Sequence, residues 1–241
     1  MGRASARALD VVAGRWTLRG GSPFFLKADS ERVGVSLVQV AEKLPAVHGR
    51  GGVSLKAACA TCASHYYSMT RLRTSGTLRY GGRVMRVRGV SWMDHEFGSE
   101  ELQRDQAGWD WFSLQLDDRR EIMSYRLRKK DGSLTAESSG SLVDARGQVR
   151  YLARDAVAVV ATGAWTSPHT RAVYPSGWRF RVPSARVDVV LVPTVADQEL
   201  VGTSGGISYW EGAVDVREFG TGRRLGVGYV ELTGYAGAIG L

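Results

Sequence analysis

The stretch WDWFSLQLDDRREIMSYRL at residues 109–127 holds two short runs in which apolar and polar residues alternate. Alternation with a period of two is typical of β-strands that bury one face. The segment Asp117–Arg120 separates the two runs and has the polar composition of a tight turn. The stretch therefore predicts an antiparallel hairpin in which Phe112 and Trp111 lie on opposite faces.

The same pattern continues on both sides of this hairpin. Turn signals recur at residues 130–132 and 144–147, and 30 glycines divide the rest into short segments without helical periodicity. The fold class predicted is all-β, with an antiparallel meander that closes into a barrel or stacks as a sandwich, since open edges invite aggregation. Closure is favoured because a barrel of about eight strands has room for one small ligand. The expected strands are residues 15–18, 33–40, 84–90, 109–116, 121–127, 134–142, 157–160, 178–182, 186–192, 208–216 and 228–233.

A chain of 241 residues could form one large β domain or two small ones. Residues 74–82 are rich in glycine and turn formers, which suggests a boundary. The segment before it supplies too few strands for a barrel of its own. The predicted division is a partial N-terminal β domain at residues 1–75 and a C-terminal β-barrel at residues 76–241.

Composition and motifs argue against several functional classes. The net charge is +8, but the basic residues are scattered and no nucleic-acid-binding signature accompanies them, so no nucleic-acid partner is expected. No apolar run is long enough for a transmembrane helix, and the first ten residues lack the apolar stretch of a signal peptide. Phosphate-binding loops, nucleophile elbows and zinc helices are missing, so no cofactor or metal is expected. The sequence leaves the oligomeric state open.

The two cysteines form a Cys59-x-x-Cys62 pair, followed by His65. Zinc needs four ligands and a thioredoxin-like site needs a βαβ setting, neither of which the sequence supplies. The alternatives are a functional site, two small loop or strand residues, or a local disulfide.

Several uncommon sequence motifs, many of them containing tryptophan, follow one another from Ser64 onward. Together they closely resemble the AttH-like proteins, whose relatives include the hydroxyneurosporene synthases, also called carotenoid 1,2-hydratases. The resemblance covers essentially the whole chain but begins partway into the family pattern. The motifs are His65-Tyr66-Tyr67-Ser68, Ser91-Trp92-Met93-Asp94-His95-Glu96-Phe97-Gly98, Gly108-Trp109-Asp110-Trp111-Phe112, Trp165-x-Ser167-Pro168, Asp197-Gln198-Glu199-Leu200, Tyr209-Trp210-Glu211-Gly212 and Gly228-Tyr229-Val230-Glu231-Leu232-Thr233-Gly234-Tyr235.

The resemblance implies two lipocalin-like β domains, of which this chain would hold part of the first and all of the second. It implies a hydrophobic small molecule, of isoprenoid or carotenoid type, as ligand or substrate. Family members are often exported or membrane-associated, which leaves the localisation open.

The first candidate site is Asp94-His95-Glu96, flanked by Trp92. In an extended segment the two carboxylates share one face and the imidazole lies on the other. A carboxyl group facing an apolar cavity has its pKa raised by desolvation and can act as an acid. A polar network at a strand end is the alternative role for this triplet.

The second candidate group is aromatic. Trp109 and Trp111 share one strand face, and Tyr125 and Arg126 lie on the next strand. Aromatic rings each stabilise a cation by about 0.5–2 kcal/mol, so several around one cavity could hold a carbocation. Core packing is the alternative explanation for each tryptophan.

The third group combines Glu211 and Glu231 with the ligand-binding candidates Trp210 and Tyr229. Carboxylates that face inward need an arginine partner or a proton. Arg126, Arg179 and Arg181 are the partners that the sequence suggests. Internal salt links that brace a barrel are the alternative.

Three functions compete on this basis. The first is an enzyme that hydrates an isolated C=C bond, with Asp94 or Glu96 as the acid and Glu211 or Glu231 as a second choice; related barrels are also associated with pericyclic ring formation. The second is a non-catalytic protein that binds a lipid or terpenoid. The third is a shortened product that needs a partner. An acid that has a raised pKa and lacks an arginine partner would favour the enzyme.

Overall fold

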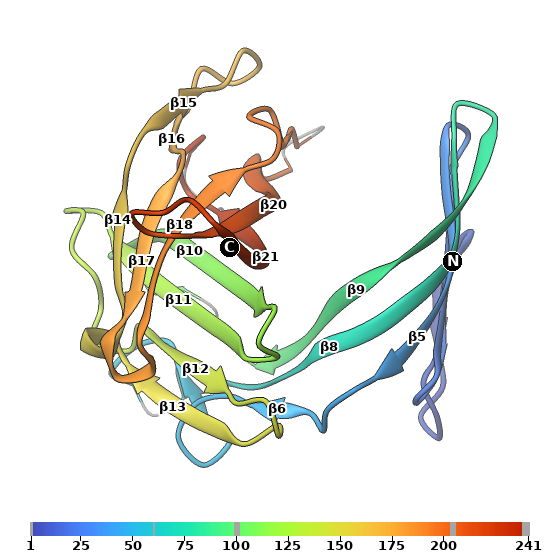
Figure 1. Ribbon diagram of the computed structural model, residues 1–241, viewed down its shortest axis with the longest axis horizontal. Helices are drawn as coiled ribbons and strands as arrows, with labels where there is room; N and C mark the ends of the chain where they lie inside the picture. Colours follow the sequence, from blue (N-terminus) through green and yellow to red (C-terminus); the bar gives the residue numbers. More distant parts are fainter. Residues whose placement is uncertain (1, 60, 99–101, 203–205, 238–241) are drawn as a thin grey trace. The chain divides into compact units, whose positions relative to one another are not determined.

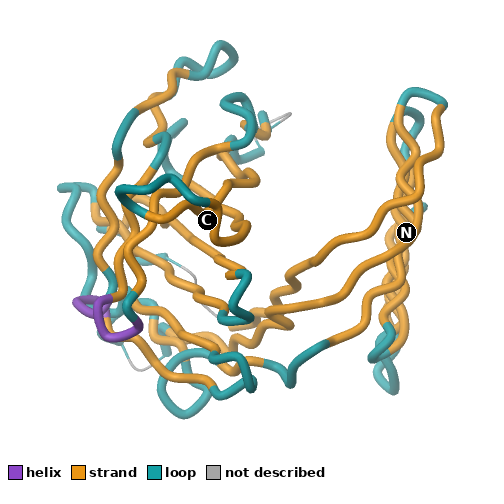
Figure 2. Tube along the Cα trace, viewed as in Figure 1, coloured by secondary structure: helices purple, strands orange, loops and turns teal. Residues whose placement is uncertain are grey.

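The computed structural model describes residues 2–59, 61–98, 102–202 and 206–237, in which nearly all regular structure is β-strand (Figures 1 and 2). The helical segments of this part are two 3-10 turns, η1 (Arg154–Ala156) and η2 (Pro183–Ala185). None of the described helices has the length and apolar character needed to cross a membrane. The all-β, lipocalin-like fold predicted from the sequence is confirmed.

The chain divides into two compact units. Unit 1 holds Met1–Pro45 and Ser68–Asp94, and unit 2 holds Ala46–Tyr67 and His95–Leu241. The two long strands β8 (Ala63–Tyr80) and β9 (Arg83–Gly98) contribute residues to both units. The predicted division between residues 75 and 76 stays a prediction.

Unit 1 is a sheet in which the strands follow the order β1-β2-β3-β4-β5-β8, and β9 also pairs with β8. Its buried apolar core is small and centres on Phe24, Met69 and Leu72. Residues 74–80, expected as a turn-rich boundary, belong to β8 instead. Gly76 allows this because the neighbouring strand passes so close that a Cβ there would lie 2.0 Å from the Ser36 carbonyl oxygen. The remaining strands of unit 1 are β1 (Gly2–Ala4), β2 (Asp10–Ala13), β3 (Trp16–Gly20), β4 (Phe24–Asp29) and β5 (Val33–Ala41).

Unit 2 contains a ten-stranded antiparallel sheet of order β13-β12-β11-β10-β21-β20-β18-β17-β14, with β19 beside β20. A separate hairpin joins β15 to β16. Before this sheet in the chain come two short strands, β6 (Ala46–Val47) and β7 (Ser54–Leu55). The others are β10 (Gln106–Leu116), β11 (Glu121–Lys129), β12 (Ser139–Val143), β13 (Val149–Ala153), β14 (Ala158–Ala161), β15 (Ala164–Thr166), β16 (Val173–Pro175), β17 (Trp178–Val182), β18 (Val187–Pro193), β19 (Glu199–Leu200), β20 (Tyr209–Glu218) and β21 (Arg224–Leu232).

The hairpin predicted from residues 109–127 is present as β10 and β11. Trp111 pairs with Tyr125 and Leu114 with Ile122, and the turn between the strands is Asp117–Arg120. The alternation of β10 places Phe112, Leu114 and Leu116 in the core.

One apolar core explains why this sheet curls. Strands at its two ends, β13 and β14, contribute Leu152 and Val159 to the same cluster as the central residues Phe112 and Val230. A sheet can bring both ends to one core only by wrapping around it, which is the lipocalin-like arrangement seen for this unit in Figure 1.

Candidate functional site

The face of the unit 2 sheet that points away from this core carries a row of five residues, one from each of five adjacent strands. Cross-strand pairing joins Ser139 to Tyr125, Tyr125 to Trp111, Trp111 to Glu231 and Glu231 to Glu211. Directly paired residues of an antiparallel sheet point to the same side. We call this set, Ser139, Tyr125, Trp111, Glu231 and Glu211, the outer row.

Glu211 is the acid of the outer row whose environment raises its pKa. Its side chain is half-buried, and desolvation raises its pKa above the ordinary value for glutamate. Its carboxyl group has no hydrogen bond or ion pair to the residues that the structure describes. It also lies directly opposite Glu231. Two facing carboxylates favour a proton on one of them.

Two tyrosines flank this pair of acids. Tyr229 and Tyr209 are each two positions before a glutamate on the same strand, so all four side chains share one face. Desolvation first, and then the negative charge of Glu211, raise the pKa of Tyr229 to about 12. The same two causes raise the pKa of Tyr209. Both phenols therefore keep their protons at neutral pH.

The other half of the outer row is covered by the segment that precedes the sheet in the chain. The hydroxyl of Tyr66 on β8 accepts a hydrogen bond from Trp111 Nε1 at 2.9 Å. The Tyr125 hydroxyl is hydrogen-bonded to Ser54 Oγ at 2.9 Å and to Ser139 Oγ at 2.8 Å. These contacts fix the aromatic rings in one orientation.

A buried lysine lies between these rings. The Nζ of Lys56 is 4.4 Å from the ring centroid of Tyr125 and 5.6 Å from that of Tyr66. It forms an ion pair of 2.5 Å with Glu96 Oε1 and donates to Ser54 Oγ at 3.3 Å. Both kinds of contact compensate for the loss of water around the ammonium group.

His48 completes this cluster. Its ring is fully buried, with Nδ1 2.9 Å from Ser141 Oγ and its centroid 4.4 Å from that of Tyr66. Burial, and then the positive charge of Lys56, lower the pKa of His48 to about 3. The imidazole is therefore neutral over the physiological range.

The predicted triplet at residues 94–96 has a different setting from the one expected of an acid in a cavity. Asp94, Glu96 and His95 are all exposed. In unit 1, Asp94 accepts hydrogen bonds from Ser68 and from Trp92 Nε1. In unit 2, Glu96 is held by Lys56 and by Ser64, while the His95 ring packs on Phe97 at 5.1 Å. These acids have the contacts of a polar network.

The remaining predicted residues divide between the two faces of the sheet. Trp109 is partly buried on the strand face of the outer row. Trp210 lies in the core, where its Nε1 donates to the Ala196 carbonyl at 2.8 Å. Arg126 is also on the core side, because it pairs with Asp110, and it donates to the Val159 carbonyl at 3.0 Å. The tryptophans and acids that the sequence singles out therefore lie on both faces of the sheet.

The arginines suggested as partners of the acids make other contacts. Arg126 has the contacts just described, and Arg179 forms an ion pair of 2.7 Å with Asp188. Arg181 lies beside Asp188 in the β17–β18 register.

The nearby Glu199 differs from Glu211. Burial raises the pKa of Glu199, but hydrogen bonds from Ser167, Thr170 and Tyr174 outweigh this effect and lower the pKa.

Sequence reasoning missed three members of the site. Tyr66 is part of the motif His65-Tyr66-Tyr67-Ser68 that carries the family resemblance, but neither Lys56 nor His48 belongs to any pattern in the sequence. Their positions depend on how residues 46–67 pack on the sheet.

A cavity of about 460 Å³ lies elsewhere in unit 2, near the β10–β11 and β20–β21 turns. Its lining carries charges of both signs, including Asp117, Arg120, Arg186, Asp188 and Arg224. Such a lining does not suit the apolar ligand that the sequence predicts.

These features define a lipocalin-like β protein with an aromatic and carboxylate row on the outer face of its main sheet. The AttH-like family model matches residues 1–235. The chain belongs to the AttH-like family.

Solved structures agree with this assignment. An AttH-like protein from Nitrosomonas europaea is 33% identical with a TM-score of 0.86, over 94% of this chain and 70% of that one. Kievitone hydratase from Nectria haematococca is 18% identical with a TM-score of 0.74, over 95% and 71% of the two chains. CghA with Sch210972 is 13% identical with a TM-score of 0.56, over 98% and 74%. No curated protein sequence matches the chain. The two more distant likenesses show the fold alone.

Proposed function

We propose that the chain is an enzyme that adds water to a carbon–carbon double bond of an apolar small molecule, with Glu211 as the acid. The observation that carries this proposal is the half-buried Glu211 carboxyl, with its raised pKa and no partner among the described residues. A protonated carboxyl group is the simplest donor for an alkene that lacks a polar handle. The hydratase among the structures of similar fold is consistent with this reaction.

The outer row supplies the other roles. Glu211 transfers its proton to one alkene carbon, and the π electrons of the double bond form the new C–H bond. The ring of Trp111, one strand beyond Glu231, stabilises the resulting cation. Glu231 takes a proton from the attacking water as the C–O bond forms. Return of that proton to Glu211 restores the starting state, and the net reaction is alkene plus water to alcohol.

Lys56 and His48 hold the site in this proposal without moving protons. Lys56 Nζ lies over the rings of Tyr125 and Tyr66, and the neutral His48 ring packs on Tyr66, so these two side chains hold the tyrosines beside Trp111. The arrangement keeps the aromatic surface rigid, which limits the rearrangement needed when the cation forms.

The test compares the wild type with Glu211→Gln and Glu231→Gln. The matched control is Glu31→Gln, which changes an exposed glutamate of unit 1. Each protein is incubated with a panel of monoterpene and sesquiterpene alkenes in heavy-oxygen water, and mass spectrometry detects labelled alcohol. Loss of a general acid lowers kcat by about 10²–10⁴-fold. We expect this fall in kcat for Glu211→Gln, while its folding and its binding of the alkenes stay unchanged.

The wild-type rate should also fall as the pH rises through the raised pKa of Glu211, because only the protonated carboxyl group donates. Wild type that binds the alkenes, as seen by tryptophan quenching, without incorporating label would refute hydration and favour a binding protein. Equal activity in Glu211→Gln and Glu31→Gln would remove Glu211 from the mechanism.

A further inference from the structure

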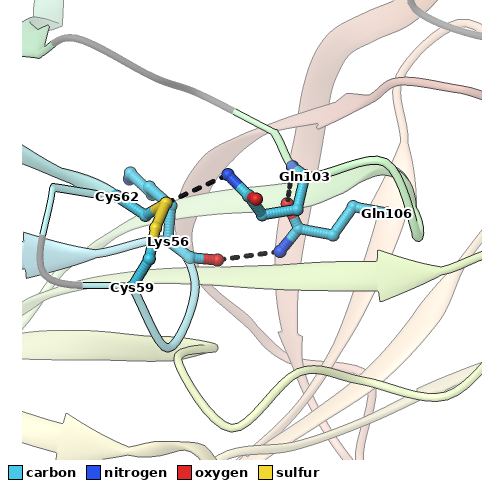
Figure 3. Close-up of a disulfide and its surroundings, with 5 residues drawn as sticks. All are labelled: Lys56, Cys59, Cys62, Gln103 and Gln106. Atoms are coloured by element: carbon cyan, nitrogen blue, oxygen red, sulfur yellow. Dashed lines mark hydrogen bonds between the residues drawn. A yellow bond between two sulfur atoms is a disulfide. The ribbon is translucent and has the colours of Figure 1, made fainter.

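Cys59 and Cys62 form a disulfide in the loop between β7 and β8, with their Cα atoms 5.2 Å apart (Figure 3). The bond closes a very short loop, and a disulfide constrains the unfolded chain least when the loop is short. Stabilisation of the fold is therefore a weak reason for this bond. Its surroundings indicate another role.

The two sulfur atoms differ in access. Cys59 is exposed, whereas Cys62 has 0% exposure. A thiolate from solution can therefore reach the sulfur of Cys59, and the sulfur of Cys62 becomes the leaving group. Gln103 Nε2 lies 3.0 Å from Cys62 Sγ and is placed to donate to the thiolate that forms (Figure 3). An exposed, attackable sulfur beside a buried, stabilised leaving group is the arrangement that thiol–disulfide exchange requires.

The same loop carries Lys56 into the site. The Lys56 amide donates to the Cys62 carbonyl at 2.8 Å, and the Lys56 carbonyl accepts from Gln106 Nε2 at 2.7 Å. Gln106 is in turn linked to Gln103, whose amide donates to Gln106 Oε1 at 2.7 Å. The backbone of Lys56 is thus held directly by Cys62 and by the glutamine pair next to its sulfur.

We propose that Cys59–Cys62 is a redox-active disulfide, opened by a dithiol reductant at Cys59, and that its opening releases Lys56 from the rings of Tyr125 and Tyr66. One thiolate of the dithiol attacks Cys59 Sγ, the S–S bond breaks, and Cys62 leaves as a thiolate. The second thiolate of the reductant then attacks its own sulfur in the mixed disulfide and releases Cys59. The dithiol is oxidised to a disulfide, and its two protons pass to solvent or to the cysteine thiolates.

The redox half of the proposal is independent of any substrate, and only the coupling to Lys56 rests on the proposed function. The folded full-length chain is titrated with dithiothreitol, free thiols are alkylated, and peptides are analysed by mass spectrometry. We expect both cysteines to be labelled while the tryptophan fluorescence of the folded state is retained. Reduction that occurs only in denaturant that also unfolds the chain would overturn the proposal.

Two variants test which sulfur is attacked. Cys62→Ser leaves Cys59 as the single thiol, and Cys59→Ser leaves Cys62. Because Cys59 is exposed and Cys62 is buried, Cys59 should form a mixed disulfide with oxidised glutathione at least about tenfold faster than Cys62. Equal rates in two folded variants would contradict the assignment. A double Cys→Ser variant with a cooperative melt shows that folding does not depend on the bond.

The coupling to the site is measured with anilinonaphthalene sulfonate, an amphipathic, anionic fluorescent probe that binds apolar protein surfaces. Reduction should weaken its binding to the wild type by roughly threefold or more, and Lys56→Met should bind it weakly in both redox states. Unchanged affinity in the reduced wild type would overturn the coupling. This outcome differs from a failure of the proposed reaction, which would leave the alkylation result intact.

Discussion

The pKa of His48 makes a quantitative prediction about stability. Burial lowers this pKa to about 3 in the folded chain, against about 6.5 in the unfolded chain. As the pH falls from 7.5 to 5, the unfolded chain binds nearly one proton at this position while the folded chain binds none. The stability contribution of neutral His48 is therefore present above pH 6.5 and is lost as the pH falls towards 3. Each pH unit is worth 1.36 kcal/mol, so the loss between pH 7.5 and 5 is about 2 kcal/mol.

The assay is urea unfolding, followed by tryptophan fluorescence, of the wild type and His48→Gln across this pH range. At pH 7.5 the variant should be less stable by about 1–3 kcal/mol, because its glutamine replaces a buried ring bonded to Ser141. At pH 5 that difference should shrink by about 2 kcal/mol. The control is His169→Gln, since His169 is half-exposed beside Asp197. A difference between wild type and His48→Gln that stays constant with pH would refute the reasoning.

Two further predictions concern the core of unit 2. Arg128→Met removes the ion pair of 2.8 Å and leaves the Asp110 carboxylate buried without it, although desolvation already raises the pKa of Asp110. We expect the free energy of unfolding to fall by about 3–5 kcal/mol, measured by urea unfolding. Adding Asp110→Asn to the Arg128→Met variant should recover part of the lost stability. Phe112→Ala opens a cavity against Trp178 and Phe180, so the free energy of unfolding should fall by about 3–5 kcal/mol while the m-value in urea stays unchanged. Unchanged stability would contradict this packing.

The sequence was sufficient for the fold because strand alternation and turn chemistry are local signals. The turn after Leu116 and the alternation of Phe112 with Trp111 are both found as expected. The segment 134–142 was less well predicted, since β12 begins only at Ser139. Residues 135 and 138 are buried there by turn contacts, including an amide of Ser138 that donates to the Thr135 carbonyl at 3.3 Å. Polar residues buried in a turn have no periodic signature.

The candidate site was predictable only in part, because it depends on contacts between distant segments. Glu211, Glu231 and Trp111 could be proposed from their motifs, yet which face each occupies follows from cross-strand register. Lys56 reaches the aromatic residues through a loop whose path depends on Cys62 and Gln106. Long-range packing of this kind leaves no trace in local spacing.

The two faces of the sheet are mechanically linked, which bears on how the site tolerates change. Trp210 is in the core and Glu211, the next residue, is in the outer row. Packing of Trp210 against Trp178, with ring centroids 6.1 Å apart, therefore fixes the strand that presents the acid. Because a strand alternates its side chains, a shift of one residue in β20 would exchange the two and bury the carboxyl group. The core thus maintains not only stability but also the half-buried position on which the raised pKa of Glu211 depends.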